Sequence, residues 1–284
     1  MLLACVLVGG IMLFAKMLGR GAVEGDLLHP LQISAGRFLF AWITLLPVFL
    51  WLRPSIRGAA WGLNIGRALC GWGSATTLFA AAALMPLADA TAISFLSPVV
   101  TLLLAIPLLH ERVGPWRFGA AIVALGGAWI LTGAGTSAFQ VAALIALAAA
   151  CFMGLESILI KKLTGIDRAL TIMFIGNSVG VVFSMTAASF VWVPPSLAQW
   201  MLLAAIGLSM AAVQGLFLLA MRRSDASFVV PFWYLTLVFA AGFDFLVFEI
   251  LPGLRSLTGA ALIIVSALVL AWRESARARM SKTL

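Results

Sequence analysis

Apolar residues run in long stretches along the whole chain, separated by short groups of glycine, proline and charged residues. A helix needs about 20 apolar residues to cross the hydrocarbon core of a bilayer. Ten stretches of about this length predict an all-α integral membrane protein with ten transmembrane helices. The expected spans are residues 1–18, 31–52, 62–84, 90–109, 115–133, 139–160, 169–192, 198–221, 226–248 and 256–273. The alternating segments of about 10 residues that build membrane β-barrels are not seen in the sequence.

The composition agrees with this reading, because 63% of the residues are hydrophobic and only 10% are charged. A soluble domain carries roughly 25% charged residues, so soluble enzymes and disordered scaffolds are excluded. The net charge of +8 would suit a nucleic-acid partner. In a multi-pass membrane protein, however, basic residues collect in cytoplasmic loops. The expected partners are therefore the lipid bilayer and a small-molecule substrate, with no nucleic acid.

The placement of basic residues predicts the orientation of the chain. With the N-terminus inside, most of the 18 lysines and arginines face the cytoplasm. Lys16, Arg20, Arg37 and Arg255 then lie toward the other side. The positive-inside rule thus predicts a protein of the cytoplasmic (inner) membrane with both termini in the cytoplasm. The apolar run from Met1 lacks a basic n-region and a clear cleavage site, so we expect a true span there.

The third to fifth spans resemble the eighth to tenth spans. In both blocks an aspartate precedes a hydroxyl residue, a proline interrupts the next span, and a glutamate ends it. The matched pairs are Asp89 with Asp225, Thr91 with Ser227, Pro98 with Pro231, and Glu111 with Glu249. Five spans per half give the halves opposite orientations. The pattern therefore predicts two inverted five-helix repeats, at residues 1–135 and 136–284.

The run from Pro86 to Leu131 combines a proline-bearing fourth span, a closing glutamate and a glycine-rich fifth span. It resembles the ten-helix members of the drug/metabolite transporter superfamily, which have two EamA-type halves. The resemblance implies export or uptake of a metabolite by alternating access. It also implies a central cavity lined by spans 1, 3, 4, 6, 8 and 9. Within the superfamily, spans 3–5 are similar to bacterial permeases for riboflavin or S-adenosylmethionine.

Pro98 and Pro231 interrupt equivalent spans of the two halves. Each removes one backbone hydrogen bond and leaves carbonyl groups free. Because paired interruptions of this kind mark binding sites in transporters, both are predicted hinges that let the cavity open. Simple packing kinks are the alternative.

Glu156 and Asp244 are carboxylates within spans, where an ionised group costs at least ~2.5 kcal/mol. Such residues usually face a cavity or a partner. Glu156 is the first candidate for neutralising a cationic substrate group or carrying a proton, and a pair with Lys161 or Lys162 is the alternative. Asp244 lies nearer the outer surface and is the second coupling candidate. A wet vestibule or a local pair explains Asp244 equally well.

Three basic residues lie near the ends of spans, namely Lys16, Arg37 and Arg67. Long basic side chains at such positions can snorkel to the membrane surface, and this is the simplest expectation for each of them. Arg67 could instead hold an anionic group through two parallel hydrogen bonds. It is therefore included among the candidate cavity residues.

Trp72, Phe232, Trp233 and Tyr234 supply aromatic surface away from the interfacial belts. The last three follow the second proline directly and form the best stacking platform for a flat or cationic substrate. Trp72 lies between two glycines, which leave space beside it. Gln214, midway along span 8, needs a partner on another helix or on a ligand. Core or lipid-facing aromatic residues are the alternative.

The sequence has no P-loop, no HExxH motif and no histidine cluster, so no cofactor, metal or ATP site is expected. It predicts a secondary permease for a small organic metabolite, riboflavin-like or S-adenosylmethionine-like, with export of amino acids or drugs as the alternative. A lipid-acting enzyme would need clustered His, Asp or Ser near one interface. A scaffold or receptor would not need paired broken helices. Coupling to protons or other ions, the direction of transport, and the monomeric or homodimeric state stay open.

Overall fold

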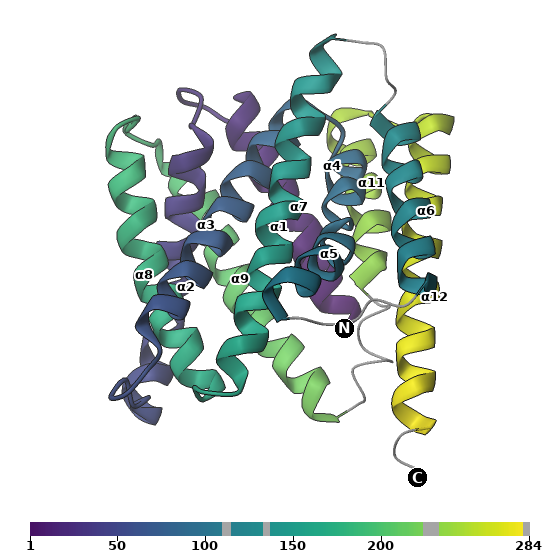
Figure 1. Cartoon of the computed structure of the whole chain (residues 1–284). Coiled ribbons are helices and arrows are strands. Elements are labelled where there is room, and N and C mark those ends of the chain that lie inside the picture. Colours follow the sequence, from purple (N-terminus) through teal and green to yellow (C-terminus); the bar gives the residue numbers. More distant parts are fainter. Residues whose placement is uncertain (110–114, 133–136, 224–232, 281–284) are drawn as a thin grey trace.

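The computed structural model describes residues 1–109, 115–132, 137–223 and 233–280. All regular secondary structure in these residues is helical. The helices pack into one bundle, with long helices running side by side (Figure 1). The predicted all-α class is confirmed.

The helices are numbered as in Figure 1. The first half of the chain forms α1 (Leu2–Arg20), α2 (Pro30–Leu52), α3 (Trp61–Leu84), α4 (Leu87–Ser94), α5 (Ser97–Leu109) and α6 (Pro115–Thr132). The second half forms α7 (Ser137–Thr164), α8 (Ala169–Ser189), α9 (Leu197–Arg223), α11 (Leu235–Phe248) and α12 (Leu254–Met280).

These helices follow the predicted spans, apart from differences in the fourth and ninth. The span expected at 90–109 consists of α4 and α5 rather than one continuous helix. The span expected at 226–248 is seen only as α11, because residues 224–232 lie outside the described part of the chain. Asp225, Ser227 and Glu111, which were matched in the repeat, also lie outside it.

Six helical segments of the described chain are long and apolar enough to cross a membrane. They are Leu2–Arg20, Pro30–Leu52, Leu87–Leu109, Val141–Thr164, Ala169–Ser189 and Leu197–Phe217. Shorter apolar segments add Phe118–Leu131, Leu235–Phe248 and Leu254–Ser266. The chain is therefore a multi-pass membrane protein.

The break between α4 and α5 lies before the proline predicted to cause it. The N–H of Phe95 still bonds to Thr91 and Ala92, and the N–H of Leu96 bonds to Ile93, which tightens the end of α4. Pro98 is then the second residue of α5. In the first turn of a helix an N–H has no intrahelical partner, so proline is tolerated there. Pro98 thus begins a new helix instead of kinking an old one.

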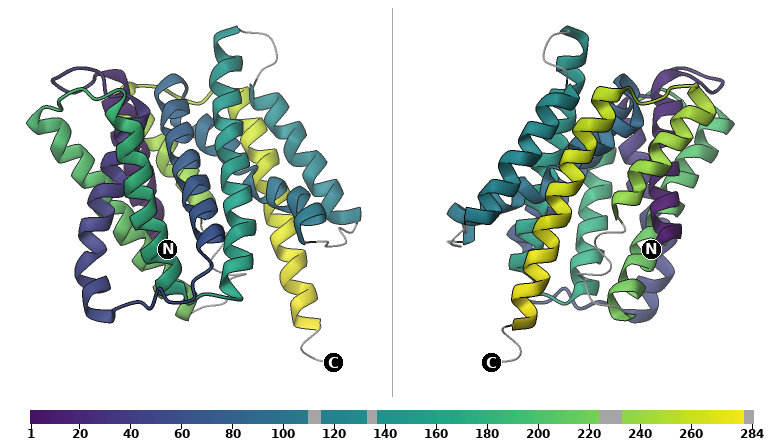
Figure 2. Two further views of the ribbon diagram at one scale, coloured as in Figure 1. Left: turned by 60° about the vertical axis from the view of Figure 1, so that its left-hand side comes forward. Right: turned by 90° about the vertical axis from the view of Figure 1, so that its right-hand side faces the viewer.

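The short α4 is surrounded by other helices, and all its residues are buried. It contacts α3, α7, α11 and α12. Around it, α3 packs on α7 and α8, α2 packs on α8 and α9, and α1 packs on α9 and α11. Helices α6 and α12 form a pair along one side of the molecule (Figure 2).

Glycines allow α6 and α12 to touch through their backbones. A Cβ atom added at Gly127 would lie 2.8 Å from the carbonyl oxygen of Gly259. One added at Gly259 would lie 2.6 Å from the carbonyl oxygen of Gly127. Membrane helices gain van der Waals contact by such close approach, since lipid provides no hydrophobic driving force between them.

Gly127→Ala is expected to destabilise the protein, although alanine is the better helix former. Overpacking of this kind typically costs about 1–3 kcal/mol. Gly126→Ala is the matched control, because a Cβ atom at Gly126 would meet nothing within 4 Å. Thermal unfolding of both variants in detergent checks this, and equal melting temperatures would contradict the close contact.

Candidate functional site

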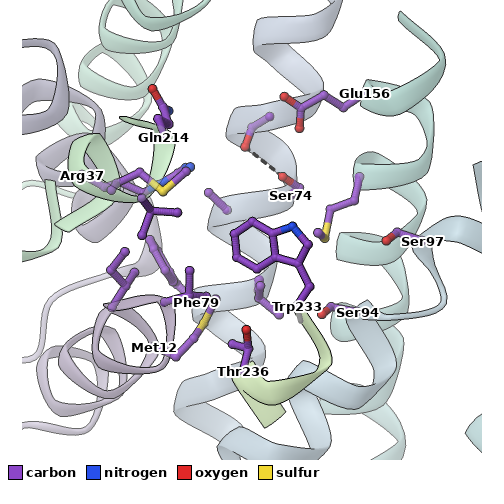
Figure 3. Close-up of a pocket in the computed structure, with 18 of the residues that line it drawn as sticks. Met12, Arg37, Ser74, Phe79, Ser94, Ser97, Glu156, Gln214, Trp233 and Thr236 are labelled. Carbon is purple, nitrogen blue, oxygen red and sulfur yellow. Dashed lines mark hydrogen bonds between the residues drawn. The ribbon is translucent and has the colours of Figure 1, made fainter. Parts of the chain in front are cut away.

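A cavity of about 520 Å³ lies in the bundle and is bordered by both halves of the chain. The six spans expected to line a central cavity all border it, as α1, α3, the α4–α5 pair, α7, α9 and α11 with the turn before it. Helices α2 and α8 border it as well, through Arg37, Phe38, Gly176 and Asn177. Figure 3 shows part of its lining, with Arg37, Glu156 and Trp233 among the labelled side chains.

Arg67 of α3 and Glu156 of α7 form an ion pair at the cavity wall. Arg67 Nη2 lies 3.3 Å from Glu156 Oε1, and the two side chains are 19% and 21% exposed. Arg67 Nη1 also donates to the carbonyl of Ile172 in α8, at 3.3 Å. Glu156 therefore pairs across helices with Arg67, rather than with Lys161 or Lys162 on its own helix.

Glycines make room for both charged head groups. A Cβ atom at Gly71 would lie 3.0 Å from Glu156 Oε1. A Cβ atom at Gly176 would overlap Arg67 Nη1. The space beside Trp72 is thus occupied by α7, since Gly73 on its other side faces Phe152. Trp72 packs against the hydrophobic core and is not among the residues bordering the cavity.

The residues of α3 that border the cavity are spaced three or four positions apart, and they include Arg67, Gly71, Ser74 and Leu78. This spacing places residues on one side of a helix. The sequence reading did not select Gly71 or Ser74 as site residues. Both are small or polar residues, and both lie on the same side of the helix as Arg67. This combination could have identified them from the sequence.

Arg37 from α2 and Gln214 from α9 are among the other polar residues that border the cavity. Arg37 Nη1, Arg67 Nε and Gln214 Oε1 are buried and have no hydrogen-bond partner among the described residues. The guanidinium carbon of Arg37 lies 4.7 Å from the centroid of the Phe38 ring. Arg37 therefore turns toward the bundle interior rather than snorkelling to the membrane surface.

Aromatic side chains form another part of the wall. Trp233 and Tyr234 precede α11 and border the cavity (Figure 3 labels Trp233). The ring centroids of Trp233 and Phe217 lie 5.7 Å apart, and the two ring planes make an angle of 38°. The rings of Tyr234 and Phe95 pack edge to face, with their centroids 5.0 Å apart. Pro231 and Phe232 lie outside the described residues. Pro98 borders the cavity at the start of α5.

A second ion pair, between Lys16 and Asp244, lies away from the cavity wall. Lys16 Nζ is 2.5 Å from Asp244 Oδ1, with side-chain exposures of 0% and 2%. Asp244 Oδ2 also accepts the N–H of Leu87 at 2.8 Å. This carboxylate therefore joins α11 to α1 and to the start of α4. The expectation that Lys16 snorkels is wrong, because a carboxylate distant in sequence supplies its partner inside the bundle.

Removing one member of this pair is expected to cost about 3–5 kcal/mol, since it leaves a buried charge unpaired. Lys16→Met should therefore lower the melting temperature more than the double variant Lys16→Met/Asp244→Asn. The asparagine removes the second charge and keeps an acceptor for the N–H of Leu87. A double variant no more stable than Lys16→Met would contradict a pairing role for Lys16. The measurement is thermal unfolding of the purified variants.

A helical membrane bundle with a polar and aromatic cavity between its halves is the arrangement of a membrane transporter. The model of the EamA-like transporter family matches residues 1–133 and again residues 140–272. The chain belongs to this family. The predicted family is confirmed, and with it the expectation of a transporter rather than an enzyme.

Named relatives agree in length as well as in sequence. The S-adenosylmethionine uptake transporter of Rickettsia bellii is 29% identical over 261 residues, which cover 92% of this chain and 89% of the relative. The riboflavin transporter of Vibrio cholerae is 28% identical over 256 residues, covering 89% and 86%. A solved crystal structure has the same fold, with a TM-score of 0.57 at 20% identity over 93% of this chain and 96% of that one.

Proposed function

We propose that the chain is a secondary-active permease of the cytoplasmic membrane. It moves a small organic metabolite by alternating access. The cavity between the halves carries this proposal, because it combines an ion pair, unpartnered polar atoms and aromatic rings within a membrane-embedded bundle. Polar groups are costly in lipid surroundings and usually serve a substrate or ion path there.

The proposed layout has ten spans in two inverted repeats, divided at residues 135 and 136, with both termini in the cytoplasm. The pairing of helices supports it. In such a repeat each span of the first half corresponds to the span five places later. Because α4 and α5 together form the fourth span, α1 corresponds to α7, α2 to α8, and α3 to α9. The contact of α3 with α7 then matches that of α9 with α1. The contact of α2 with α9 matches that of α8 with α3. The contact of α5 with α7 likewise matches that of α11 with α1.

Within this layout, Pro98 and Pro231 act as the hinges of the two halves, and Pro98 borders the cavity. The substrate is contacted by six side chains, those of Glu156, Arg67, Gln214, Trp233, Tyr234 and Phe232. Trp72 supports the cavity wall from the hydrophobic core. The named relatives favour a riboflavin-like or S-adenosylmethionine-like substrate. The flat rings of both compounds suit the aromatic wall at Trp233 and Tyr234.

Counterflow in proteoliposomes tests transport without knowledge of the coupling ion. Vesicles are loaded with one unlabelled compound and diluted into a trace of its labelled form. Riboflavin, S-adenosylmethionine, tryptophan and a quaternary amine form the panel. We expect a transient accumulation of label for one of the first two. No overshoot for any of the four, with correctly folded protein, would contradict the proposal.

Gly71→Val should abolish this overshoot, because a side chain there fills the space of the Glu156 carboxylate. Gly62→Val on the same helix is the matched control, since a Cβ atom at Gly62 meets nothing within 4 Å. Equal counterflow by the two variants would place the substrate path elsewhere.

Glu156 is the proposed proton carrier, with Asp244 as the second candidate. Glu156→Gln cannot release a proton, so it should remove the pH dependence of net transport and leave exchange intact. Glu24→Gln, at an exposed loop position, controls for the loss of a carboxylate. Uptake is measured between pH 5 and pH 8 for each variant. An unchanged pH profile in Glu156→Gln would eliminate that residue and move the test to Asp244→Asn.

A further inference from the structure

The charges at the cavity wall do not balance. In the described part of the chain, the charged side chains that border the cavity are those of Arg37, Arg67 and Glu156. The pair of Arg67 with Glu156 cancels two of these charges. One guanidinium charge is therefore left over at the cavity wall.

The surroundings of Arg37 leave its hydrogen-bonding edge available. The Phe38 ring is the aromatic group beside the guanidinium, at 4.7 Å from its central carbon. A ring in this position contributes to charge stabilisation but accepts no in-plane hydrogen bond. Arg37 Nη1 has no partner among the described residues, although it is buried. An unsatisfied charged donor inside a membrane protein is costly, so its retention indicates a partner that arrives with the ligand.

A planar oxyanion is the partner that a guanidinium fits best. Arginine donates two parallel hydrogen bonds to a carboxylate, and charge-assisted bonds of this kind are about twice as strong as neutral ones. The rest of the wall describes the remainder of the ligand. Trp233 and Tyr234 offer flat apolar surface (Figure 3 shows Trp233 in the cavity and Arg37 on another part of its wall).

We propose that Arg37 is the carboxylate-binding residue of this cavity, so that its substrates carry a carboxylate together with a flat ring. The inference rests on the proposed transport function, because it names what the same cavity accepts. It separates the candidate substrates: S-adenosylmethionine and tryptophan each carry both a carboxylate and a flat ring system, whereas riboflavin has rings without a carboxylate.

The test measures binding rather than transport, on the full chain in lipid nanodiscs by isothermal titration calorimetry. The probes are S-adenosylmethionine with its methyl ester, tryptophan with its amide, and riboflavin. We expect at least one acid to bind about 10- to 100-fold more tightly than its neutral derivative, the range expected for a hydrogen bond to a charged group. Arg37→Gln should reduce the affinity for the acid to that for the neutral derivative.

Two further variants separate recognition from folding. Arg37→Lys keeps the charge and loses the two-pronged donor, so an intermediate affinity for the acid is expected. Arg57→Gln removes one positive charge from an exposed loop and should leave the preference unchanged. Three results would each overturn the inference. The acid and its neutral derivative bind with equal affinity, the preference for the acid survives in Arg37→Gln, or neither acid binds.

Binding and counterflow fail independently, so the two proposals can be told apart. Acid binding that depends on Arg37 without any counterflow would support this site and contradict the transport function. Counterflow of riboflavin with no preference for an acid would support transport and overturn the role of Arg37.

Discussion

An ionised side chain inside an apolar bundle needs a compensating partner, and this need connects the two halves of the protein. Lys16 and Asp244 join α1 of the first half to α11 of the second. Arg67 and Glu156 join α3 of the first half to α7 of the second. Neither pair is local in sequence. Charge compensation therefore acts here as a link between halves, where lipid provides little net drive for helices to associate.

Relative movement of the halves must strain or exchange these links. In the proposed cycle, a cavity that opens alternately to the two sides requires the contacts of α1 with α11 and of α3 with α7 to change. The pair at the cavity wall is partly exposed, whereas the Lys16–Asp244 pair is fully buried. Breaking the Arg67–Glu156 pair costs less free energy when a substrate group replaces one partner. Breaking the Lys16–Asp244 pair would leave two buried charges without partners.

Small residues provide the space that this arrangement needs. Gly71 and Gly176 leave room for charged head groups, while Gly127 and Gly259 bring two helix backbones into contact. A glycine thus serves either a polar pocket or a tight helix contact. The choice depends on which side of its helix it occupies, and neighbouring glycines such as Gly126 and Gly127 differ completely in this respect.

The positions of the helices could be predicted from the sequence, because an apolar run of sufficient length must be helical in lipid whatever surrounds it. The break near Pro98 was predicted but misplaced by two to three residues, since the proline is accommodated in the first turn of α5. Glu156, Arg67 and Gln214 could be selected as site candidates because polar groups are rare within spans. The pairing of Glu156 with Arg67 could not be predicted in the same way.

The all-helical class, the approximate helix ends and the family could be predicted from the chain alone, because these depend on local hydropathy and on residues adjacent along the chain. The packed structure was needed to establish that Glu156 pairs with Arg67, that Lys16 is buried against Asp244, and that Trp72 packs outside the cavity wall. Each of these depends on the rotation of one helix about its axis against another. That rotation is set by packing over many residues, and hydropathy within a uniformly apolar span carries little information about it.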